Sequence, residues 1–128
     1  MRRNTGRLIE KLVPRAKFWF ELDGELILGR GGALLLRGID EYGSISQAVK
    51  AIPEDDLGEM ESPSYRFAWG YLRKVEERLG APIVEKRRGY REGSGGTALT
   101  ELGQQLLKLY EKYEEKLKDL LTQKGDME

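Results

Sequence analysis

The chain has 128 residues, which suits one domain with its own hydrophobic core, and its 22 Lys and Arg balance 22 Asp and Glu. It contains no Cys and no His, which excludes disulfides and thiolate metal sites and removes the commonest general base and metal ligand. We therefore expect no enzyme, no metal and no other cofactor, and the lack of a long apolar run or a signal-peptide pattern favours a cytoplasmic protein without a membrane span.

The N-terminal residues 1–17 are polar and basic, and they predict a flexible arm with at most a short helical turn near residues 8–13. Two β-prone runs follow, residues 18–22 and residues 25–28. Because Asp23-Gly24 between them is a strong two-residue turn signal, these runs predict a β-hairpin.

A glycine-rich stretch at residues 29–32 lacks the pattern of a phosphate-binding loop and is expected to be a connector. Apolar residues at helical spacing then predict a first helix over residues 33–42, which Gly43 ends. The second helix is expected to have Ser46 as its N-cap and to end at Pro53. Its predicted buried face consists of Ala48, Val49 and Ile52.

The acidic residues 53–61 show no periodicity, so they predict a solvated loop; a cation site there lacks the required pattern. Ser62-Pro63 predicts the start of a third helix that runs to Leu79 and stops at Gly80. Its predicted buried face consists of Tyr65, Ala68, Trp69, Leu72, Val75 and Leu79. The outward residues are then Ser64, Arg66, Phe67, Gly70, Tyr71, Arg73 and Lys74. Phe67 and Tyr71, four residues apart, form an outward aromatic pair. Two interpretations of this pair remain: contact with DNA, or packing under the acidic loop.

A short strand at residues 82–85, a glycine-rich stretch at 89–96 and a returning strand at 97–99 predict a second hairpin, or wing. Thr100 is a good N-cap for a last helix over residues 101–123. The expected fold class is α+β, mainly helical: a winged helix-turn-helix with an N-terminal β-hairpin and a long C-terminal dimerisation helix. The expected organisation is a basic arm (1–17), a DNA-binding domain (18–100), and the last helix with a short tail (101–128).

This order of elements predicts binding to double-stranded DNA, because a helix fits the major groove and a wing reaches phosphates beside it. The alternative for the wing is a solvated basic turn. The predicted DNA-binding residues are Ser46, Ser62, Ser64, Tyr65, Arg66, Phe67, Gly70, Arg73, Lys74, Lys86, Arg87, Arg88, Tyr90 and Arg91.

The last helix carries apolar residues at steps of three and four, as in a heptad seam. They predict a homodimer through this helix, which would align two recognition helices on a pseudo-palindromic operator. The alternative is a helix that folds wholly onto its own domain. The predicted interface residues are Leu102, Leu106, Leu109, Tyr110, Tyr113, Leu117 and Leu120.

Three segments carry a family resemblance: residues 43–49 (GSISQAV), 64–69 (SYRFAW) and 93–100 (GSGGTALT), followed by Leu102-Gly103. They resemble the N-terminal domain of ModE-type molybdate-responsive regulators of prokaryotes, whose winged helix is similar to that of LysR-type regulators. The resemblance implies DNA binding through the helix that carries Ser64, Tyr65 and Arg66, a wing at 86–96, and dimerisation through this domain.

Two features depart from that family. Residues 53–61 are inserted where the turn is normally short, and the 128 residues leave no room for the molybdate-binding module of full-length members. A stand-alone DNA-binding form is therefore expected, with no small-molecule effector on the chain itself. The zero net charge and the acidic insert keep two alternatives open: a winged-helix protein-interaction module and a sequence-tolerant architectural DNA binder.

Overall fold

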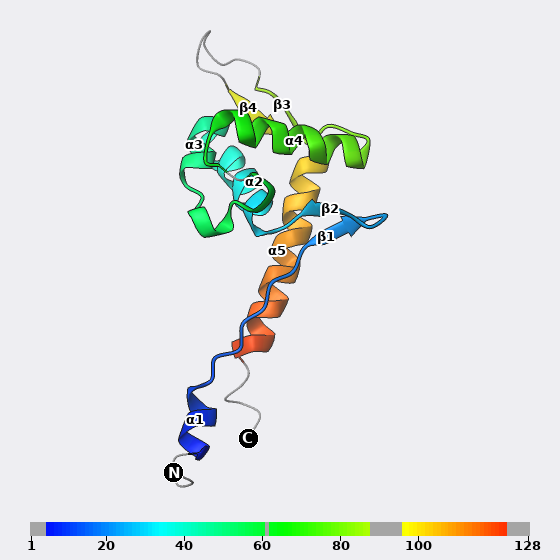
Figure 1. Ribbon diagram of the computed structural model, residues 1–128. Coiled ribbons are helices and arrows are strands. Elements are labelled where there is room, and N and C mark those ends of the chain that lie inside the picture. The colour runs from blue at the N-terminus through cyan, green and yellow to red at the C-terminus, as the bar shows by residue number, and fades with distance from the viewer. Residues whose placement is uncertain (1–4, 61, 88–95, 123–128) are drawn as a thin grey trace.

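The computed structural model describes residues 5–60, 62–87 and 96–122. The chain is mainly helical with two small antiparallel hairpins, which confirms the predicted fold class. The helices α2, α3 and α4 form one body, and α5 extends from it past the first hairpin (Figure 1). The elements are α1 (Thr5–Lys11), β1 (Phe20–Leu22), β2 (Glu25–Leu28), α2 (Arg30–Tyr42), α3 (Ile45–Lys50), η2 (Glu54–Asp56), η3 (Gly58–Met60), α4 (Tyr65–Leu79), β3 (Val84–Lys86), β4 (Thr97–Leu99) and α5 (Glu101–Thr122). Within these residues, no helix combines the length and the apolar character that crossing a bilayer requires.

The first hairpin, β1–β2, turns at the dipeptide predicted from the sequence. Asp23 has φ 52° and Gly24 has φ 83°. Two successive residues with positive φ match the right-handed twist of the flanking strands, which is why a short Asp-Gly loop is favoured here. The strands pair antiparallel, with Leu22 opposite Glu25 next to the turn.

The glycine-rich stretch before α2 is not a connector, because the helix already begins at Arg30. Gly31 and Gly32 are buried in its first turn. A Cβ on Gly31 would overlap the backbone carbonyl of Asp56, and one on Gly32 would overlap the hydroxyl of Tyr71. These glycines therefore permit close contacts with segments far along the chain, which helical periodicity alone does not reveal.

The second helix, α3, is capped by Ser44 and not by Ser46. The Ser44 Oγ accepts a hydrogen bond from the backbone N–H of Gln47 at 3.2 Å, whereas Ser46 lies exposed in the first turn. Helices α2 and α3 approach closely, since a Cβ on Gly38 would lie 2.6 Å from the Cβ of Ala48. The helix-turn-helix packing thus depends on a glycine facing an alanine.

The acidic insert is an ordered part of the core's edge, contrary to the predicted solvated loop. It forms the short 3₁₀ helices η2 and η3, and the side chains of Leu57 and Met60 are buried. Leu57 follows η2 directly and Met60 ends η3, and both side chains enter the core while the carboxylates stay outside. Residue 61 lies outside the described part of the chain.

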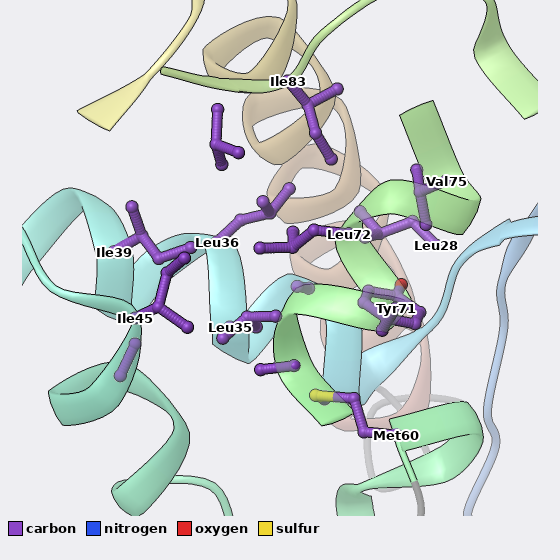
Figure 2. Packing of buried hydrophobic residues seen from close by; sticks show 14 of the residues in the cluster. Leu28, Leu35, Leu36, Ile39, Ile45, Met60, Tyr71, Leu72, Val75 and Ile83 are labelled. Carbon is purple, nitrogen blue, oxygen red and sulfur yellow. The ribbon is translucent and has the colours of Figure 1, made fainter. Parts of the chain in front are cut away.

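The core lies between α2, α4 and the strand β2. In Figure 2, Leu72 of α4 points between Leu36 of α2 and Leu28 of β2, and all three are fully buried. Met60 of the insert closes the lower side of this cluster, near Tyr71 (Figure 2). The cluster fixes the axis of α4 relative to α2.

Helix α5 is attached to the body by its first half. Thr100 caps it as predicted, because its Oγ1 accepts a hydrogen bond from the Gly103 N–H at 3.1 Å. Arg37 of α2 donates hydrogen bonds to Glu111 and Glu114, each at 3.1 Å. Burial of the guanidinium lowers the pKa of Arg37, whereas the carboxylates of Glu111 and Glu114 raise it, and the net effect is a raised pKa.

Candidate nucleic-acid interface

Helix α4 begins later than the sequence suggested. Its N-cap is Ser64, whose Oγ accepts a hydrogen bond from the Phe67 N–H at 3.3 Å, so Ser62 and Pro63 precede the helix. Both serines are capping residues, and the second lies directly before the helical residues. The N-terminal end of α4, where free backbone N–H groups favour an anion, is thus set by Ser64 and Tyr65.

The exposed face of α4 carries the predicted contact residues. Arg66 lies exposed in the first turn of this face, and among the described residues no carboxylate pairs with it. The guanidinium of Arg73 lies 5.5 Å from the centre of the Trp69 ring, a cation–π contact that leaves the charge on the surface. The exposed residues of this face are Tyr65, Arg66, Phe67, Trp69, Gly70, Arg73, Lys74 and, nearer the C-terminal end, the acidic Glu77.

Three aromatic positions on α4 differ from the sequence prediction. Tyr65 and Trp69, expected in the core, are 54% and 36% exposed. Tyr71, expected on the surface, is buried at 6% exposure, and its hydroxyl donates a hydrogen bond to the Ile27 carbonyl at 3.3 Å. Since Tyr71 shares its face with Ala68 and Val75, spacings of three and four already allowed this orientation.

Burial of Tyr71 gives an expected pH dependence of stability. Burial, and then the charge of Glu59, raise the pKa of Tyr71 above its ordinary value of 10.0. The folded protein therefore holds this proton when the unfolded chain has lost it, so the free energy of unfolding should fall as pH rises above about 10. Urea unfolding can be measured from about pH 8 to about pH 11, a range that spans the ordinary tyrosine pKa. Over this range the free energy of unfolding should fall less steeply for Tyr71→Phe than for Tyr65→Phe. Equal slopes would mean that Tyr71 is not the titrating group.

The mid-helical Gly70 lies in open space, with nothing within 4 Å of where its Cβ would be. Glycine inside a helix is less favourable than alanine by roughly 1 kcal/mol, and no contact with the described part of the chain requires it here. The bare backbone at this position allows a large partner to approach the face between Arg66 and Arg73.

The acidic insert flanks the other side of α4 without covering its exposed face. Glu59 pairs with Arg78 at 3.2 Å and with Lys74 at 3.8 Å. Arg78 also donates a hydrogen bond to the Leu26 carbonyl at 2.6 Å. The charges of Lys74 and Arg78 are therefore partly neutralised, whereas Arg66 and Arg73 pair with no carboxylate of the described residues.

The second hairpin adjoins the helix-turn-helix. The backbone N–H of Thr97 in β4 donates a hydrogen bond to the carbonyl of Gly43, the residue that ends α2, at 2.9 Å. Lys86 and Arg87 are exposed at the end of β3, whereas the other predicted wing residues, Arg88, Tyr90 and Arg91, lie outside the described residues. The wing and α4 are thus held by the same body.

The residues of the predicted dimer seam on α5 differ in how far they are exposed. Tyr110 is buried within the chain, with its ring stacked on Phe18 at 4.5 Å between centroids. Leu109, Tyr113 and Leu120 are 43%, 46% and 64% exposed. The remaining predicted interface residues are half-buried: Leu102, Leu106 and Leu117.

Sequence reasoning missed two contributors to this surface. Glu59 neutralises the distal cations of α4, and Trp69 supports Arg73. The second had a visible signal, because residues four apart on a helix are neighbours. Glu59 had none, since its partner Arg78 lies across the tertiary structure. Within the described residues, no group of three or more acidic side chains gathers as a metal site.

Comparison with known proteins gives two similar sequences, whereas no profile of a known protein family matches the chain. The chain is 36% identical over 77 residues to the transcriptional regulator ModE of Haemophilus influenzae, covering 60% of the chain and 26% of that protein. It is 33% identical over 76 residues to the molybdenum transport protein ModE of Azotobacter vinelandii, covering 59% and 24%. The chain spans about a quarter of the length of these curated relatives, and the matches confirm its resemblance to ModE-type proteins.

Proposed function

We propose that the chain is a sequence-specific, double-stranded DNA-binding transcription regulator that acts as a homodimer. The observation that carries the proposal is the exposed face of α4, where Arg66 lies beside the helix N-terminus, pairs with no carboxylate of the described residues and has aromatic side chains on both sides. An α-helix fits the major groove, and an arginine there makes two hydrogen bonds to a guanine edge. In this arrangement Arg66 reads a base.

The surroundings of α4 support the same docking. Lys86 and Arg87 at the end of β3 are placed to meet phosphates beside the groove. The open backbone at Gly70 lets the duplex approach, and Arg73 and Lys74 extend the contact along the strand. We include Ser62, Ser64, Tyr65 and Phe67 at the helix start, Ser46 on α3, and the wing residues Arg88, Tyr90 and Arg91 in the proposed interface.

The dimer is proposed to form through the exposed stripe of α5. Leu109, Tyr113 and Leu120 remain 43%, 46% and 64% exposed, although one edge of the Tyr113 ring also packs against Phe20 with centroids 5.7 Å apart. A two-fold axis at this stripe would bring two α4 helices onto successive major grooves, roughly 34–36 Å apart on B-DNA. The target is then a pseudo-palindromic operator.

The regulated process is proposed from the relatives. One is named a transcriptional regulator and the other a molybdenum transport protein. We therefore propose control of genes for molybdate, tungstate or related metabolism. Genomic fragments that the protein retains should include such genes.

A salt titration with a duplex selected from those fragments tests the proposal. Binding should weaken linearly on a log–log scale, with a slope of about −0.9 for each phosphate neutralised, because counterions are released. The selected duplex should also be preferred over random duplex by roughly 10³-fold or more. Equal affinity for both would indicate an architectural DNA binder, and no binding to either would leave a protein-interaction module.

A further inference from the structure

The N-terminal helix α1 and the residues after it expose most of the surface of four apolar side chains. Leu8, Ile9, Leu12 and Val13 are 59–67% exposed, and α1 has no buried residue. Helices shorter than roughly 12–15 residues are marginal in water without a packing surface. With 7 residues, α1 needs a partner surface to be a stable helix.

An unfilled groove of about 730 Å³ lies between the arm, the start of α2, the insert and the distal half of α5. Its apolar lining includes Trp19, Leu57, Leu117 and Leu121. This distal half of α5 projects beyond the body of the domain (Figure 1). The same chain thus carries an apolar helix and an apolar hollow of matching character.

The path of the arm directs α1 away from its own groove. Arg15, Ala16 and Lys17 form part of the groove wall, and Pro14 precedes them directly. Proline fixes its own φ, and the residue before it, Val13, is restricted to extended conformations. The chain before Pro14 continues in the direction that leaves the groove, and α1 lies beyond the end of α5 and not in its own groove (Figure 1).

We infer that the groove receives α1 of a second copy of the chain, so that two copies exchange their N-terminal arms. In a two-fold interface each copy offers the same patch, which requires a projection and a matching hollow on one chain. The groove also lies beside the proposed dimer surface, because Leu117, which lines the groove, is one helical turn from Tyr113 on α5. This inference rests on the homodimer of the proposed function and names its second contact.

The size of the α5 stripe supports an additional contact. Stable interfaces bury roughly 800 Å² on each partner, contributed by about 20–30 residues. The stripe offers three well-exposed apolar side chains, Leu109, Tyr113 and Leu120. Reciprocal docking of two arms adds the four apolar side chains of each arm and the linings of two grooves.

Crosslinking tests the exchange directly, because the chain has no natural Cys. Ile9→Cys and Leu121→Cys are made in separate full-length chains and mixed under mild oxidation. We expect a disulfide-linked product that contains one copy of each variant. Mixing Ile9→Cys with Lys108→Cys, whose thiol would lie on the exposed proximal part of α5, should give little product. If a chain carrying both Ile9→Cys and Leu121→Cys gave chiefly an internally crosslinked monomer, α1 would occupy its own groove and the inference would be wrong.

Sedimentation supplies a second test with matched variants of the N-terminal arm, in α1 and at Leu12 directly after it. Leu8→Ser with Leu12→Ser should raise the dimer dissociation constant by about tenfold or more, because apolar burial is lost. Arg7→Ser with Lys11→Ser makes the same new side chains on the opposite face of α1 and should change it by less than about twofold. An unchanged constant for the leucine pair, with DNA binding retained, would overturn the arm exchange and leave the proposed function standing. If instead the unmodified chain showed no selective DNA binding, the proposed function would be wrong.

Discussion

Arg66→Ala is expected to weaken binding to the selected duplex by about 1–3 kcal/mol, or roughly 5- to 150-fold. Arg66 is exposed at the N-terminal end of α4, and its charge is not paired with a carboxylate of the described chain. Removal therefore takes away a group available for a base edge without breaking an internal contact. Fluorescence anisotropy with the selected duplex and with its single-base variants measures both the affinity and the discrimination.

The matched control is Lys112→Ala, which removes one exposed positive charge from α5. It should leave affinity within about twofold, as expected for a surface change away from a contact. An equal loss from Arg66→Ala on every sequence would assign Arg66 to a phosphate rather than a base. A loss no greater than that of the control would remove α4 from the interface.

Tyr71→Ala should lower the free energy of unfolding by about 3–5 kcal/mol, as truncation of a buried aromatic ring does. The ring is 6% exposed, its hydroxyl bonds the Ile27 carbonyl, and it fits against the bare backbone of Gly32. Its removal leaves a void between α4, β2 and α2 and leaves that carbonyl without this donor. Urea unfolding followed by circular dichroism measures the change.

Tyr65→Ala makes the same substitution on the same helix, where the ring is 54% exposed. The free energy of unfolding should change by no more than about 0.5 kcal/mol. Its effect should appear instead as weaker DNA binding. The two substitutions thus separate the buried and exposed faces of α4, and a larger loss of stability from Tyr65→Ala would mean that the faces are reversed.

The order of elements was predictable because turn residues mark their ends. Asp23-Gly24 forms a tight turn, and Gly43 and Gly80 end α2 and α4 with φ of 68° and 77°. Such signals are local, since they depend on the backbone conformation that one or two residues allow. The surface position of Arg66 followed equally from helical spacing.

What the sequence did not reveal depends on contacts between distant segments. The orientation of Tyr71 is decided by the Ile27 carbonyl and the bare backbone of Gly32, both on other elements. The insert is held by the buried side chains of Leu57 and Met60. Two apolar residues among acidic neighbours are not enough to form a periodic pattern. Tertiary contacts override local patterns at such positions.

The pairing of Glu59 with Lys74 and Arg78 has a consequence for how the protein would find its target in a genome. Phosphate attraction supplies nearly all of the affinity for arbitrary sequence, whereas base contacts supply discrimination. In the proposed interface, this carboxylate would weaken the attraction of Lys74 and Arg78 for any phosphate backbone, and so reduce retention on bulk chromosomal DNA, while it does not pair with Arg66. The occupancy of an operator depends on the ratio of its affinity to the affinity of the many competing non-specific sites in a genome. An acidic residue beside the proposed recognition helix α4 would therefore favour selectivity over tight binding.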